Sequence, residues 1–255
     1  MKRRALFQAG VGALAAGLPS MALAAPRRPV RVLCWSEGTA PVSVYPKEIA
    51  GAVADALRPV AQFEVRTASL ADADQGLADA ALDVTDALFW WGHQRHGQVR
   101  DDRVDAVVKR VREGGMGFVA LHSSHYSKPF KRLMEDACDL GGVGINDAPE
   151  QITVKAPGHP IARGISDFQI PREEFYNEPF RVPPPDVVVF ESTWRTGQRF
   201  RSGCVWQRGN GRVFYFRPGH ETFPTYFQPE VKTILVNAAR WIGPRQVSIG
   251  IVKPD

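Results

Sequence analysis

The first half of the chain alternates short apolar runs with segments whose apolar residues recur at helical spacing. The apolar runs predict buried strands at residues 31–35, 86–91 and 117–121, and a weak alternation predicts another strand at 63–67. The helical patterns cover residues 46–60, 104–111 and 130–137, and a short helix is expected within the loop at 70–82. This repeated β-α order predicts a parallel sheet with helices on both faces, which is the α/β fold class.

The second half has shorter strands and more turns. Strands are predicted at residues 151–154, 187–190, 203–207 and 212–216. Arg208-Gly209-Asn210-Gly211, between the last two, is a strong β-hairpin signal. Residues 173–178 predict an acidic, aromatic loop, and a final amphipathic helix ends at Gly243-Pro244. We therefore expect a single domain over residues 30–243 and a loosely attached tail over 244–255.

The first residues have the pattern of an export signal. Lys2, Arg3 and Arg4 precede an apolar stretch without acids at residues 5–18, and Ala22-Leu23-Ala24 offers a cleavage site. A signal peptide over residues 1–24 is predicted, because the stretch is too short to span a membrane. The arginine pair favours the twin-arginine route, with an ordinary Sec signal as the alternative. A periplasmic or secreted protein without membrane contact after cleavage is expected.

Charge and cysteine content narrow the class of protein. Cleavage would remove three positive charges and no acids, which lowers the net charge from +5 to +2. Without a basic cluster interleaved with aromatic residues, nucleic acid is not an expected partner. Cys34, Cys138 and Cys204 are odd in number and far apart, so we predict small buried residues rather than disulfides.

Histidines gather where two of the predicted strands end. The run at 117–121 leads into His122-Ser123-Ser124-His125-Tyr126, and the run at 86–91 leads into Gly92-His93-Gln94-Arg95-His96. Parallel strands place their carboxyl ends at one edge of a sheet, and ligands of open α/β sheets bind outside that edge. Both histidine-bearing turns are therefore expected at one candidate site.

Several segments together resemble the ThuA-like (trehalose utilisation) family. They are residues 89–96, 119–128, 156–161, 173–176 and 214–221. The resemblance implies a class I glutamine amidotransferase-like fold, a flavodoxin-like three-layer sandwich with a mostly parallel sheet, to which the predicted hairpin adds. It also implies a link to trehalose or disaccharide breakdown, beside a dehydrogenase that makes 3-keto sugars. An exported member departs from a cytosolic trehalose pathway.

A second departure concerns the turn after residue 121. His122 or Ser123 stands where amidotransferases of this fold carry a nucleophilic cysteine, and none of the three cysteines lies at a strand-to-helix turn. Glutamine hydrolysis is therefore not expected. Ser123 is a candidate nucleophile if a histidine reaches it. The alternative is a turn or cap serine that bonds backbone amides.

The fold that the resemblance implies also brings His220 to the same sheet edge. His122, His220 and His93, with Glu174 or Glu178, then form a plausible ligand set for a divalent metal, zinc favoured. The alternative is a metal-free polar pocket in which these groups hydrogen-bond sugar hydroxyls. His122, His220, Glu174, Glu178 and Ser123 are the candidate catalytic residues. The candidate substrate-binding residues are His93, His96, His125, Tyr176 and Arg217.

Two of these residues have specific expected roles. The Tyr176 ring would cover the apolar face of a sugar, and Arg217 would anchor an anionic or keto group or else pair with Glu221. The leading hypothesis is an exported enzyme of sugar or keto-sugar metabolism, of isomerase, hydrolase or lyase type, using acid-base or metal-assisted chemistry. The alternative is a non-catalytic periplasmic carbohydrate-binding or sensing protein. The expected partner is a small sugar, no nucleotide or flavin is expected, and homo-oligomerisation is left open.

Overall fold

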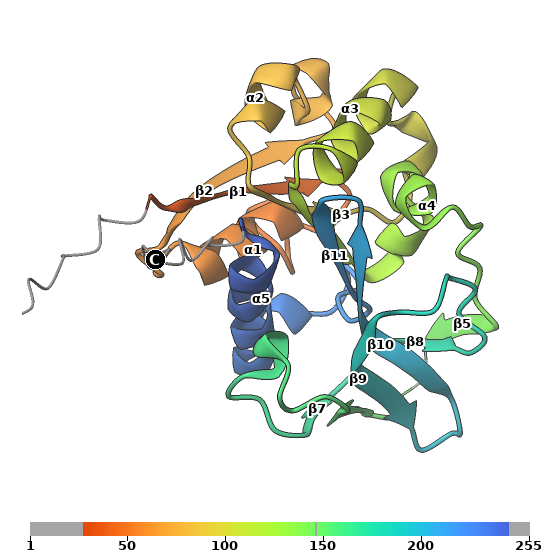
Figure 1. Ribbon diagram of the computed structural model, residues 1–255. Coiled ribbons are helices and arrows are strands. Elements are labelled where there is room, and N and C mark those ends of the chain that lie inside the picture. The colour runs from red at the N-terminus through yellow and green to blue at the C-terminus, as the bar shows by residue number, and fades with distance from the viewer. Residues whose placement is uncertain (1–27, 146, 245–255) are drawn as a thin grey trace, which may run out of the picture.

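The computed structural model describes residues 28–145 and 147–244 of the chain (Figure 1). The predicted signal peptide, and the predicted tail beyond its first residue, lie outside these ranges. Inside them, no helix combines the length and the apolar character that crossing a membrane requires.

A nine-stranded sheet forms the centre of the molecule, and five of its strands are parallel. The parallel strands are β1 (Val30–Ser36), β2 (Phe63–Ser69), β3 (Ala87–Trp91), β4 (Gly117–Leu121) and β11 (Gly211–Phe216). They lie in the order β2-β1-β3-β4-β11, which is the flavodoxin-like order. The inner strands are continuous apolar runs because both faces of the sheet are covered. The predicted fold class is confirmed.

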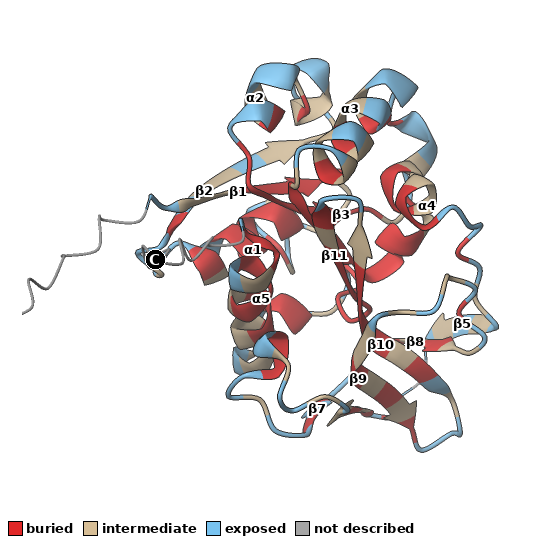
Figure 2. Ribbon diagram, in the orientation of Figure 1, coloured by how far each residue is buried: buried red, intermediate tan, exposed pale blue. Residues whose placement is uncertain are grey.

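Helices cover both faces of the parallel half (Figures 1 and 2). They are α1 (Glu48–Leu57), α2 (Asp79–Asp83), α3 (Asp101–Arg112), α4 (Lys128–Met134) and α5 (Pro229–Ile242). Side chains of α1 and α5 share one core with Trp91, and those of α3 and α4 share the other with Trp90. Successive strand residues point to opposite faces, so the two tryptophans serve different cores. Helix α4 stops before the predicted residue 137, because Glu135 adopts a left-handed conformation.

The remaining strands of the large sheet are antiparallel to their neighbours. They are β10 (Arg199–Arg208), β9 (Val187–Trp194), β6 (Glu150–Val154) and β7 (Phe168–Ile170). Strands β10 and β11 form the predicted hairpin. A separate small sheet pairs β5 (Gly142–Ile145) with β8 (Glu174–Asn177). The prediction of a loop at 173–178 is wrong, because this segment finds its partner about thirty residues earlier in a glycine-containing strand that was not predicted.

The register of the parallel strands brings three turns to one place. Trp91, the last residue of β3, pairs with Leu121 at the end of β4, and Leu121 pairs with Phe216 at the end of β11. The strand ends are therefore level. Side chains that follow them within a few residues emerge at the same edge of the sheet, as the sequence predicted for the two histidine turns.

Candidate metal centre

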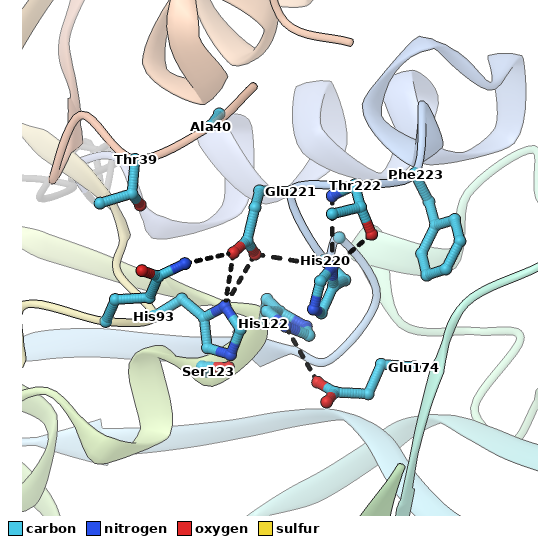
Figure 3. Close-up of polar contacts among 12 residues, drawn as sticks. Thr39, Ala40, His93, His122, Ser123, Glu174, His220, Glu221, Thr222 and Phe223 are labelled. Atoms are coloured by element: carbon cyan, nitrogen blue, oxygen red, sulfur yellow. Dashed lines mark hydrogen bonds and ion pairs between the residues drawn. The ribbon is translucent and has the colours of Figure 1, made fainter. Parts of the chain in front are cut away.

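Four of the predicted site residues converge at this edge. His93, His122, Glu174 and His220 each offer one nitrogen or oxygen atom, and these atoms all lie within 4.8 Å of one another. The ring centroids of the three histidines are 5.0 to 5.3 Å apart. Figure 3 shows the three rings between the carboxylates of Glu221 and Glu174. The histidines follow β3, β4 and β11, whereas Glu174 opens β8 of the small sheet.

His122 lies at the sharp turn directly after β4. Its φ of +53° falls in the left-handed region, which a side-chain-bearing residue enters rarely and at a cost. Of the two candidates, His122 rather than Ser123 therefore takes the strained position. Its Nδ1 lies 3.1 Å from the carbonyl oxygen of Arg217, and its Nε2 lies 3.3 Å from Oε2 of Glu174. The ring is fully buried, and burial lowers its pKa well below the usual value, so the imidazole is neutral.

His93 is held by a carboxylate on the far side of its ring. Its Nδ1 lies 2.7 and 2.9 Å from the two carboxylate oxygens of Glu221. The backbone that follows is fixed as well, since the N–H groups of Gln94 and Arg95 donate to the buried carboxylate of Glu37. The His93 side chain is 25 % exposed, so the cluster meets solvent at this residue.

His220 is fixed through its backbone and through its ring. The N–H groups of Gly219 and His220 donate to the buried carboxylate of Glu173. Gly219 has a φ of +124°, and a Cβ there would lie 2.0 Å from the Tyr226 hydroxyl oxygen, so only glycine fits this turn. The His220 Nδ1 accepts the backbone N–H of Thr222 at 3.2 Å and lies 2.9 Å from Oγ1 of the same residue.

His93 and His122 each have an acceptor at Nδ1, which leaves Nε2 free for a ligand, whereas the Nδ1 of His220 accepts a backbone N–H. We assign the Nδ1 proton of His93 and His122 from their acceptors, Glu221 and the Arg217 carbonyl. Fixing Nδ1 in this way is how proteins orient histidines that bind metals. The Nε2 lone pair of neutral His122 then faces Oε2 of Glu174, which is buried and accepts no hydrogen bond. Two acceptors repel at this distance unless a cation or a proton lies between them.

Buried charge around the cluster is unbalanced. Among the described residues, the carboxylates buried here are Glu37, Glu150, Glu173, Glu174 and Glu221, and the only buried guanidinium is that of Arg217. Arg217 pairs with Glu150. Burial raises the pKa of Glu150 and Glu174, and it raises that of Glu173 to about 7. Buried charges need a counter-charge, and a divalent cation at the cluster would supply one.

The residues also fit a metal by geometry and chemistry. Imidazoles with one carboxylate are ordinary ligands of catalytic zinc, and tetrahedral bonds of about 2.0–2.2 Å place ligand atoms about 3.3–3.6 Å apart. The observed limit of 4.8 Å therefore requires side chains of the cluster to move inward when an ion binds.

Ser123 and Tyr176 form a buried pair beside the cluster. Their hydroxyl oxygens lie 2.7 Å apart, and the Tyr176 hydroxyl lies 3.5 Å from the Nε2 of His122. The backbone roles considered for Ser123 belong to its neighbours instead, because Ser124 Oγ donates to the Trp90 carbonyl and Ser127 caps α4. The hydroxyl of Ser123 is bonded to a tyrosine and not to the histidine that a serine nucleophile needs.

Four other predicted residues lie outside the cluster. For two of them, Arg217 and Glu178, the predicted role is wrong. Arg217 is fully buried and pairs with Glu150 of β6, not with Glu221 or a substrate. Glu178 pairs with Arg201, because it follows the end of β8 and lies beside β10. His125 is buried with Nδ1 3.5 Å from the Tyr215 hydroxyl, and neither ring nitrogen of His96 is hydrogen-bonded. Sugar binding by these two histidines stays a prediction.

Three supporting carboxylates, Glu37, Glu173 and Glu221, escaped the sequence analysis as functional residues. Glu37 directly follows the first predicted strand, and Glu221 directly follows His220, so adjacency to a strand end was an available signal. Glu173 offers no such signal. Cys34, Cys138 and Cys204 are free and buried as predicted, and none lies at the turn of His122. Burial raises the pKa of Cys138 and of Cys204 to about 12.

Comparison with known proteins agrees with this architecture. The sequence model of one family, described as ThuA: Trehalose utilisation, matches residues 31–242. A ThuA-like protein from Bacteroides uniformis shares 19 % identity at a TM-score of 0.62, covering 89 % of this chain and 95 % of its own. A ThuA-like protein from Parabacteroides merdae shares 13 % identity at a TM-score of 0.64, covering 84 % of this chain and 90 % of its own. The PurLQS structure from Thermotoga maritima shares 15 % identity at a TM-score of 0.53, covering 84 % of this chain and 99 % of its own. These likenesses show the fold alone, and no curated protein sequence matches the chain.

Proposed function

The chain belongs to the ThuA family of trehalose-utilisation proteins, and from that premise we propose that it is a metal-dependent enzyme acting on a sugar or keto-sugar. His93, His122, His220 and Glu174 would hold a divalent cation, zinc favoured. The observation that carries the proposal is the convergence of three histidines, two of them with an acceptor at Nδ1, on a buried carboxylate oxygen that has no hydrogen-bond partner.

Each residue of the cluster has a role in such a reaction. When bound, the ion would polarise a carbonyl or hydroxyl oxygen of the sugar and stabilise negative charge on it. Glu174 and the Tyr176 hydroxyl, which Ser123 holds in place, are the groups beside the cluster that can accept or donate a proton. This set suits isomerisation, hydration or glycosidic cleavage next to a carbonyl. Glutamine hydrolysis is not proposed, since no thiol lies at the turn that His122 occupies.

The test is turnover of a defined substrate. Purified protein incubated with 3-keto-trehalose and related 3-keto-glycosides should form products that liquid chromatography with mass spectrometry detects. A chelator should abolish turnover, and zinc should restore it. Saturable sugar binding without turnover, with or without added zinc, would reject the enzyme and leave a carbohydrate-binding or sensing protein.

Export belongs to the same proposal, and its basis is the sequence of residues 1–24. If the twin-arginine route carries the protein, replacing Arg3 and Arg4 by lysine should retain it in the cytoplasm, as fractionation and immunoblotting would show. Unchanged export of this variant would favour the Sec route instead. Cytoplasmic retention of the unaltered protein would reject export by either route.

A further inference from the structure

Glu221 lies beside two of the three histidines of the cluster and is not one of the proposed metal ligands. Its two oxygens lie 2.9 and 2.7 Å from the Nδ1 of His93, and one of them lies 3.6 Å from the Nδ1 of His220. Figure 3 shows it on the side of the rings away from Glu174. A carboxylate behind a histidine fixes the ring, keeps the proton on Nδ1 and makes Nε2 a stronger electron donor.

The carboxylate is itself held. The Gln94 amide Nε2 donates to Oε1 of Glu221 at 2.9 Å, and the backbone N–H of Gln94 donates to Glu37. The side chain of Glu221 is 5 % exposed. A rigid carboxylate of this kind differs from a mobile surface ion pair, whose contribution is small.

A buried carboxylate aimed at a ring nitrogen has the arrangement of the carboxylate–histidine–metal unit.

We propose that Glu221 is the positioning residue of the cluster. It orients His93 so that the free nitrogen of this ring faces the ion, and it thereby sets metal affinity. Glu221 does not bind the ion and does not touch the substrate. The inference rests on the proposed metal-dependent function, which the experiment must therefore test separately.

The experiment measures the zinc dissociation constant by competition with a chromogenic chelator. Glu221→Gln keeps the size of the side chain and removes its charge, and we expect zinc to bind about 10- to 100-fold more weakly, the usual effect of losing such a partner. Glu230→Gln, in the first turn of α5 and away from the cluster, is the matched control and should bind zinc like the unaltered protein.

A second variant guards against failure to fold. Glu221→Asp keeps the charge but withdraws the carboxylate from His93 by about one C–C bond of 1.5 Å, so it should also weaken zinc binding. Circular dichroism of the metal-free proteins decides which variants are folded. A folded Glu221 variant that binds zinc within about threefold of the unaltered protein overturns the positioning role and leaves the metal centre intact. Absence of zinc binding by the unaltered protein overturns the metal centre itself.

Discussion

The two edges of the parallel sheet both bury carboxylates, but among the described residues only one edge gives each of them a guanidinium partner. At the amino edge, Asp86 precedes β3 and is paired with Arg28 and Arg31, so one carboxylate meets two guanidiniums. At the carboxyl edge, five buried carboxylates and three histidines meet one guanidinium, that of Arg217. The pairing around Asp86 is complete within the protein. We propose that a cation from outside completes the cluster at the carboxyl edge, and the two edges differ in this respect.

Removing Arg217, which carries the only buried guanidinium among the described residues, should have the largest effect on stability. Arg217→Met would leave Glu150 buried without its partner, and the free energy of unfolding should fall by about 3–5 kcal/mol. Urea denaturation monitored by circular dichroism measures the change. Adding Glu150→Leu removes the orphaned charge and should restore most of the loss. A fall below about 1 kcal/mol would mean that the carboxyl edge does not depend on this charge.

Removing the carboxylate of the cluster should cost metal affinity without costing stability. Glu174→Gln should weaken zinc binding by more than about 100-fold, beyond the range expected for a supporting residue. The metal-free variant should be at least as stable, because an amide N–H can donate to the Nε2 of His122 where two acceptors now face each other.

Glu178→Gln is the matched control for this change, since Glu178 was the other carboxylate that the sequence offered. It should leave zinc binding unaltered and lower the free energy of unfolding by breaking the pair with Arg201. Isothermal titration calorimetry measures the zinc affinity of each variant, and urea denaturation measures its free energy of unfolding. The reverse assignment, with Glu178 controlling zinc affinity, would show that the structure selects the wrong glutamate.

The stability that the ion pairs of Asp86 contribute at the amino edge should depend on pH. Burial opposes ionisation of Asp86, but hydrogen bonds from Arg28 and Arg31 outweigh burial and hold its pKa below the usual 3.8. A lowered pKa stabilises the fold above the unfolded pKa, and this contribution is lost as pH falls through the folded pKa. Asp86→Asn should therefore cost about 1.5–3 kcal/mol at pH 7, the range for hydrogen bonds to a charged group.

The measurement is denaturation of both proteins between pH 7 and pH 2. The gap between them should be constant down to about pH 5 and shrink below about pH 4, where the unfolded carboxylate takes up its proton. The same gap should not depend on zinc. A gap that widens on acidification would contradict the assigned pairing.

The parallel half of the fold and its histidines could be predicted because their signals are local. Apolar runs predict the strands, and the parallel order of these strands predicts that His93 and His122 lie at the same edge of the sheet. The confirmed hairpin between β10 and β11 rests on a similarly local turn, Gly209-Asn210. Each of these features depends on residues close together in the sequence, where spacing and turn chemistry decide the outcome.

The remaining features depend on pairing between distant segments. Glu174 and Tyr176 share the buried face of β8, but that strand exists only through its pairing with β5. The partner of Arg217 lies on β6, in the antiparallel extension of the sheet, and no spacing in the sequence indicates it. The choice between Glu174 and Glu178, and the structural role of Arg217, therefore required the three-dimensional arrangement.

The most direct test of the central claim is the metal content of the protein. Elemental analysis of protein purified without chelator should find about one zinc, manganese or similar divalent ion per chain. His122→Ala and His220→Ala should each remove most of it, while His159→Ala, a histidine in a distant turn that packs against Trp241, should not. Metal-free unaltered protein that also fails to take up zinc, or unchanged metal content in the first two variants, would contradict the account.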